Sequence, residues 1–106
     1  MTRLFSTAVG VLALLAAVGG ASAAGDVKAG KAKAATCAVC HGANGEGSVQ
    51  GSVTYAALAG MNADQMVQEL QDFKSGKRPG PTMSPLMIML TANDMGNLAA
   101  YYASLK

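Results

Sequence analysis

The stretch Cys37-Ala38-Val39-Cys40-His41 constrains this chain most, because it contains the only two cysteines and the only histidine of the sequence. Two thiols three positions apart, followed directly by an imidazole, form the complete attachment motif of c-type haem. On one turn of helix, each thiol can add to one vinyl group of the porphyrin while His41 projects toward the iron. The motif therefore predicts a covalently bound haem held by Cys37 and Cys40, with His41 as an iron ligand.

Three alternatives compete with haem attachment at these residues. A disulfide-exchange site normally lies near a βαβ pattern, and no convincing strand precedes Cys37. A zinc site needs a second Cys/His pair to complete a tetrahedron, and the sequence has none. A structural disulfide between Cys37 and Cys40 leaves His41 without a role. Haem attachment uses all three residues and is the leading hypothesis.

The N-terminal residues are typical of a secretory signal peptide. Arg3 precedes an uncharged run that is most apolar between Val9 and Val18, and Ala21 and Ala23 form an A-x-A cleavage site. An uncleaved membrane anchor is the alternative, because the run is about long enough to span a bilayer. Glycines dilute its end, however, where a membrane span should stay apolar.

We therefore expect residues 1–23 to be removed on export and residues 24–106 to form the working domain. Export agrees with the motif, because c-type haem is attached outside the bacterial cytoplasm. The expected location is the periplasm, with a mature form that does not span the membrane.

The 83 residues of this domain contain few large core-forming side chains. Val, Leu, Ile and Phe together make up 13 of them, whereas Ala alone makes up 15. Chains of this size usually need a disulfide, a metal or a bound group to complete a stable core. A large apolar macrocycle would supply the missing bulk, and small residues would let helices approach it closely.

Hydrophobic spacing and turn residues divide the domain into helices and loops. We expect one helix over 26–40, a second over 63–75 and a last one that starts at Thr91. Residues 42–60 are rich in glycine and predict a loop, while three prolines in 77–90 prevent a regular helix before Leu86. No segment indicates a firm strand, so the predicted class is all-α.

The helix starts carry residues suited to capping. Asp26, Asn62 and Thr91 are the expected N-caps. Gln65 and Asp94 each lie three residues further on, where a side chain can return a hydrogen bond to the cap and complete a capping box.

Six methionines of the domain could supply a second axial ligand: Met61, Met66, Met83, Met87, Met89 and Met95. Most methionines only fill gaps in apolar cores. Met83 differs because Pro81 and Pro85 flank it, which favours an extended strap able to cross the open face of the ring. Met83 is the preferred ligand and Met87 the next, with the other methionines and an open position left as alternatives.

The domain resembles class I cytochromes c, in particular the small bacterial periplasmic electron carriers. The resemblance runs from Gly25 to Lys106. It lies in Gly25-Asp26, Gly30-Lys31, Cys37-Ala38-Val39-Cys40-His41-Gly42, Leu58-Ala59-Gly60, Phe73-Lys74-Ser75-Gly76, Met83-Ser84-Pro85, Leu90-Thr91 and Leu98-Ala99-Ala100-Tyr101-Tyr102. In that family the axial methionine lies seven residues before the leucine that closes the loop ahead of the final helix, as Met83 does before Leu90. The resemblance implies three to five helices around one covalent haem c, with His41 and Met83 as axial ligands.

Two positions depart from the family's pattern. Ala34 stands where the family usually has an aromatic residue against the last helix, so Tyr101 or Tyr102 is expected to fill that space. Ala56 stands where the family tends to have a proline whose carbonyl accepts the N–H of the axial histidine. The Ala56 carbonyl can still orient His41, in a less rigid loop.

The resemblance implies a one-electron carrier in respiratory electron transport. The lone histidine is assigned to iron, and no Ser/His or paired-carboxylate arrangement remains, so the residues indicate no enzyme. The alternatives are a cytochrome subunit of a periplasmic oxidoreductase complex, or a haem enzyme or gas-binding protein with an open distal position.

The expected partners are redox proteins, such as a dehydrogenase, a cytochrome complex or a terminal oxidase, and the expected state is a monomer. Seven basic and six acidic residues in the domain give no sign of a nucleic-acid-binding patch. Lys74, Lys77 and Arg78 form a small basic cluster. It is either a solvated helix end, a partner for a haem carboxylate, or a surface that steers an acidic partner. Tyr55 and Leu58 could contact the ring or serve ordinary packing.

Overall fold

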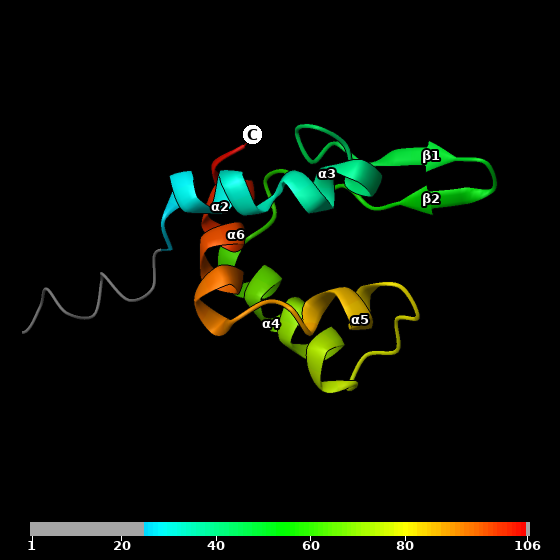
Figure 1. Cartoon of the computed structure of the whole chain (residues 1–106). Coiled ribbons are helices and arrows are strands. Elements are labelled where there is room, and N and C mark those ends of the chain that lie inside the picture. Colours follow the sequence, from blue (N-terminus) through cyan, green and yellow to red (C-terminus); the bar gives the residue numbers. More distant parts are fainter. Residues whose placement is uncertain (1–24, 106) are drawn as a thin grey trace, which may run out of the picture.

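The computed structural model of the protein describes residues 25–105 (Figure 1). This part contains five helices and one hairpin of two strands: α2 (Val27–Lys33), α3 (Ala35–His41), β1 (Ser48–Gln50), β2 (Val53–Tyr55), α4 (Ala63–Ser75), α5 (Met83–Met87) and α6 (Ala92–Ser104). The predicted signal peptide at residues 1–23 lies outside the described residues. The predicted helical class is confirmed. None of the helices described is long and apolar enough to cross a membrane.

The helix predicted over 26–40 is in fact two short helices. Asp26 caps α2 as predicted, because its Oδ1 accepts hydrogen bonds from the backbone N–H groups of Lys28 at 2.9 Å and Ala29 at 3.1 Å. Ala34, with a ψ of −10°, ends α2 and precedes α3. The prediction missed this break because no glycine or proline marks it. The two halves have different neighbours: α2 packs against α6, while α3 carries the Cys-His motif.

Asn62 caps the start of α4 as predicted, but only one of the two hydrogen bonds of the predicted capping box forms. The Asn62 Oδ1 accepts a hydrogen bond from the backbone N–H of Gln65 at 3.0 Å. The Gln65 side chain does not return this bond and instead donates to Glu69 at 2.9 Å. The predicted capping box is therefore wrong for α4, because the carboxylate one turn ahead attracts the amide. Gly76, with a φ of 84°, ends the helix.

The capping box predicted for α6 is confirmed. The Thr91 Oγ1 accepts from the backbone N–H of Asp94 at 3.0 Å, and the Asp94 carboxylate accepts from that of Thr91 at 2.9 Å. The second bond lowers the pKa of Asp94 below its usual value. The same carboxylate lies 3.6 Å from the Nζ of Lys33, so the cap also links α6 to the end of α2.

The contact between α2 and α6 is unusually close at Gly30. A Cβ atom at this position would lie 1.9 Å from the Asn97 carbonyl oxygen, so only glycine allows the two backbones to approach. Tyr101 and Tyr102 are buried in the same cluster as Ala34, and their ring centroids lie 5.1 Å apart. The tyrosines thus fill the space beside Ala34, as predicted.

The expectation of a loop without strands over 42–60 is wrong. β1 and β2 pair antiparallel, with Ser48 opposite Tyr55. The turn is Gly51-Ser52, and Gly51 has a φ of 64°, which a two-residue hairpin turn with glycine first requires. Strands of three residues are too short to show alternation, but a Gly-Ser pair between segments that contain valine, threonine and tyrosine is a hairpin signal that the prediction missed.

The extended strap predicted around Met83 is also wrong, because α5 begins there. Pro85 is the third residue of this helix, where a missing backbone N–H costs no intrahelical hydrogen bond. The N–H of Ser84 donates to the Gly80 carbonyl at 2.9 Å, which supports the first turn. Pro85 is therefore compatible with this short helix, and Pro79 and Pro81 lie before its start.

Candidate functional site

A cavity of about 410 Å³ lies between the helices and is lined mostly by apolar side chains. Residues of α3 form one wall together with the end of β2 and the segment that follows it. Residues of α4, of α5 and of its flanking segments form much of the rest, and Leu98 and Tyr102 of α6 contribute as well. In Figure 1, α3 and the hairpin lie in the upper part of the view and α4 and α5 in the lower part. The cavity therefore has walls from segments far apart in the sequence.

All three reactive residues of the motif line this cavity. Cys37, Cys40 and His41 occupy the last two turns of α3, and each is partly buried. The two thiols are free, so the structure contains no disulfide between them. Among residues 25–105, no group of three or more His, Cys, Asp or Glu side chains is arranged to hold a metal ion.

The Cys37 thiol has a neighbour that the sequence did not single out for chemistry. Burial raises the pKa of Cys37 above its usual value, and the neighbouring hydroxyl of Tyr102 offsets part of this effect. Burial and the thiol together raise the pKa of Tyr102. Tyr102 was predicted only as packing. A polar role could have been predicted from its hydroxyl on the buried face of α6, since a buried phenol usually finds a hydrogen-bond partner.

His41 is held in one orientation by the segment after the hairpin. Its Nδ1 lies 2.7 Å from the carbonyl oxygen of Ala56. A carbonyl can only accept, so Nδ1 carries the ring proton and Nε2 keeps its lone pair free for a metal. The Tyr55 ring stands nearly edge-on to the imidazole, with centroids 6.0 Å apart. The expectation that the Ala56 carbonyl orients His41 is confirmed.

The hairpin fixes the end of α3 that carries these residues. The Ser48 hydroxyl donates to the Cys40 carbonyl at 2.5 Å, and the Gln50 amide donates to the Val39 carbonyl at 3.1 Å. These bonds satisfy carbonyl groups in the last turn of α3, which a helix cannot satisfy itself. The hairpin was missing from the prediction, and its hydrogen bonds were missed with it.

Met83 lies on the wall formed by α5. Leu86 and Met87 line the cavity as well, because residues three and four apart share one helical face, and Leu90 lines it from the segment after the helix. Of the other methionines, three also line this cavity, namely Met61, Met66 and Met89. The structure thus brings the preferred candidate and its runner-up to the same cavity as His41.

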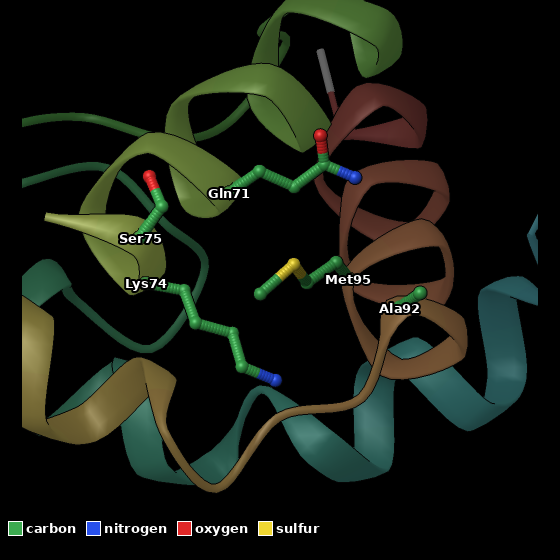
Figure 2. Close-up of a pocket in the computed structure, with 5 residues that line it drawn as sticks. All are labelled: Gln71, Lys74, Ser75, Ala92 and Met95. Atoms are coloured by element: carbon green, nitrogen blue, oxygen red, sulfur yellow. The ribbon is translucent and has the colours of Figure 1, made fainter. Parts of the chain in front are cut away.

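Met95 lies elsewhere, which agrees with its predicted role in packing. It is 1% exposed and lines a separate, smaller pocket of about 190 Å³ with Gln71, Lys74, Ser75 and Ala92 (Figure 2). The Nζ of Lys74 donates to the Leu90 carbonyl at 2.5 Å, so this cation links the end of α4 to the segment before α6. Lys74 therefore connects two segments of the fold and does not line the large cavity.

Arg78 differs from the rest of the basic cluster because it lines the large cavity. Its guanidinium lies 4.7 Å from the centroid of the Phe73 ring, and its Nη1 lies 3.3 Å from the Oε1 of Glu69. Lys77 is exposed and does not contribute to the lining. The ring and the carboxylate thus position one cation at the cavity wall.

The donor set fits an iron porphyrin. Two thiols and an imidazole with a free Nε2 lie on one wall, and methionine thioethers lie on another. Imidazole and thioether are established axial ligands of haem iron, and the lining between them is apolar, as a macrocycle requires. The four residues predicted from the sequence, namely Cys37, Cys40, His41 and Met83, therefore line one cavity.

Comparison with known proteins gives a consistent result. The family model described as Cytochrome c matches residues 27–106. Cytochrome c4 of Pseudomonas aeruginosa is 40% identical, over 92% of this chain and 47% of its own length. Cytochrome c-554(548) of Halomonas halodenitrificans is 34% identical, over 76% of this chain and 98% of its own length. The thiosulfate dehydrogenase electron acceptor of Stutzerimonas stutzeri is 37% identical, over 63% of this chain and 30% of its own length.

A solved structure agrees with these relatives. Reduced recombinant cytochrome c4 from Pseudomonas stutzeri has a TM-score of 0.66 and 33% identity, covering 78% of this chain and 47% of that chain. The chain thus spans about half the length of the cytochrome c4 relatives it matches.

Proposed function

The chain belongs to the cytochrome c family, and on that premise we propose that it is a periplasmic one-electron carrier with a single haem c. Family membership implies covalently bound haem c. Cys37 and Cys40 hold the haem through thioether bonds, and His41 and Met83 are the axial ligands of its iron. Residues 1–23 act as the signal peptide, and residues 24–106 form the cytochrome domain.

One observation carries this proposal. The cavity of about 410 Å³ has both thiols, the imidazole and the Met83 thioether on its walls, although Met83 lies 42 positions after His41 in the sequence. Haem iron supplies the one-electron chemistry when it is bound. The chain supplies the ligands and the apolar surroundings. The Ala56 carbonyl fixes the ring of His41 and leaves the lone pair of Nε2 free, so this nitrogen would bind the iron.

The residues also account for a carrier rather than a catalyst. The thioether of Met83 is a soft donor that favours ferrous iron and raises the reduction potential. Apolar burial acts in the same direction, because it disfavours the higher charge of ferric iron. The only histidine is used as a ligand, so its imidazole is not available as a catalytic base.

The proposal is tested on protein exported with and without the haem-attachment machinery. With the machinery, a pyridine haemochrome assay gives one haem per chain, and the purified protein titrates reversibly with one electron. The oxidised protein shows the weak far-red band of a sulfur–iron bond. A haem protein that lacks this band and binds added gas ligands would instead be an enzyme or a gas-binding protein with an open distal position.

The second candidate is a cytochrome unit that serves one oxidoreductase. The match to a protein named as the electron acceptor of thiosulfate dehydrogenase favours it, and it keeps the same carrier chemistry. Copurification with a dehydrogenase from the periplasm separates it from a carrier that exchanges electrons with several redox proteins.

The charge of Arg78 at the cavity wall should affect the midpoint potential of the haem. Replacing Arg78 with Gln should lower the midpoint potential, because a nearby cation opposes the extra positive charge of ferric iron. A partly screened unit charge contributes on the order of 1 kcal/mol, or roughly 40 mV for one electron. The matched control is Lys77→Gln, which removes the same charge outside the cavity. Equal potentials for both variants would contradict a role for Arg78 at the haem.

A further inference from the structure

The cavity offers the iron more than one thioether on a single helical turn. Met83 and Met87 are the first and last residues of α5 and lie four positions apart, so both point to the same side of the helix. Both line the large cavity. Met87 is 3% exposed, whereas Met89, on the segment that follows, is 72% exposed.

The position of α5 allows one residue to replace the other. The helix packs against α4. The side of α5 that faces away from the cavity carries few buried groups, since Pro85 is exposed and the following Ile88 is 69% exposed. A displacement of α5 by about 6 Å along its axis, slightly more than one turn, carries each residue to the position of the residue four places away in the sequence. Little apolar burial on that outer side opposes such a shift, so its main cost is the movement of Met87 out of its buried position.

We propose that Met87 is a reserve axial ligand, which binds the iron when the Met83 thioether leaves it. This inference rests on the proposed function, because it takes Met83 as the resident ligand. In the exchange, the bond between the Met83 sulfur and iron breaks and the bond between the Met87 sulfur and iron forms. No electron or proton is transferred, and the iron keeps six ligands.

The reserve ligand has a chemical purpose. Met83 is only partly buried, so once its sulfur has left the iron a peroxide can oxidise the thioether to the sulfoxide, with the peroxide reduced to water or an alcohol. Met87 is shielded from the same reagent by its burial. Replacement of Met83 by Met87 keeps the sixth position closed, so that the protein continues to carry electrons instead of binding small ligands.

The test uses exported holoprotein with four variants: Met83→Leu, Met87→Leu, Met83→Leu/Met87→Leu and Met83→Leu/Met89→Leu. Leucine keeps the apolar volume, so each variant should fold. The readouts are the far-red sulfur–iron band of the oxidised protein and its affinity for added imidazole. The Met89 change is the matched control, because Met89 lines the same cavity but is largely exposed.

We expect Met83→Leu and Met83→Leu/Met89→Leu to keep the band, and Met83→Leu/Met87→Leu to lose it. Imidazole should bind Met83→Leu/Met87→Leu at least about tenfold more tightly than it binds Met83→Leu. In Met83→Leu the Met87 thioether occupies the iron most of the time, and the apparent affinity for imidazole falls in proportion to the fraction of protein whose site is open. Loss of the band in Met83→Leu alone, with imidazole affinity equal to that of the double variant, would overturn the proposal.

Two further results separate this inference from the proposed function. Met87→Leu alone should keep both the band and the low imidazole affinity of the unchanged protein. If this single change removes the band, Met87 is the resident ligand, and both the assignment of Met83 and the reserve role are wrong. If the unchanged protein carries haem but has no band, the His/Met ligation itself is wrong, and the reserve role is overturned with it.

Discussion

Replacing both Cys37 and Cys40 with alanine should leave the exported protein colourless and unfolded. Without covalent haem, the cavity of about 410 Å³ remains in the middle of the domain. At about 24 cal/mol per Å³, a cavity of this volume costs roughly 10 kcal/mol, which is comparable to the whole free energy of unfolding of a typical domain. Haem staining after denaturing electrophoresis and far-ultraviolet circular dichroism measure the two effects.

The matched control for this variant is Val39→Ala, which lies between the two cysteines. Val39 is 74% exposed and does not line the cavity, so its truncation should keep the haem and change the stability by less than about 0.5 kcal/mol. A cysteine-free variant that lacks haem and still shows the helical spectrum and a cooperative unfolding transition would contradict the view that haem completes the core.

Replacing Gly30 with alanine should lower the free energy of unfolding of the holoprotein by about 3 kcal/mol. The added methyl group would lie 1.9 Å from the Asn97 carbonyl oxygen and 2.8 Å from the Cβ of Tyr101. A backbone oxygen cannot turn away as a flexible side chain does, so α2 and α6 must separate. Denaturant unfolding monitored by circular dichroism measures the loss.

Gly96→Ala is the control on the facing helix. A Cβ at Gly96 meets no atom within 4 Å, and alanine loses less conformational entropy than glycine in a helix. This variant should be as stable as the unchanged protein, or more stable by up to about 1 kcal/mol. Equal stability of the Gly30 and Gly96 variants would show that the close approach of α2 and α6 is not needed.

Local patterns explain which parts of the fold could be predicted. The caps at Asp26, Asn62 and Thr91 depend only on residues within one turn of helix, and the structure confirms all three. The capping box predicted between Asn62 and Gln65 does not form, because the side-chain amide of Gln65 donates to Glu69 one turn further on. The break at Ala34 depends on the separate neighbours of α2 and α3, which no local pattern reveals.

The same reasoning explains the candidate site. Cys37, Cys40 and His41 share one short motif, so their joint position on the cavity wall follows from a single helix. Met83 was predicted as a ligand from the prolines that flank it and from the family resemblance. It does line the cavity, but from a helix rather than from the predicted extended strap. The partners of Tyr102 and Arg78 depend on tertiary packing, so only the structure could identify Cys37 and Glu69 as their neighbours.

The intact mass of the exported protein, measured under denaturing conditions after treatment with a thiol alkylating reagent, tests most directly whether haem is bonded to both cysteines. The mass should exceed that of the processed polypeptide by one haem, with no alkyl group on Cys37 or Cys40. A polypeptide of unmodified mass that gains two alkyl groups would show that no thioether bond exists, and that the cavity is completed in some other way.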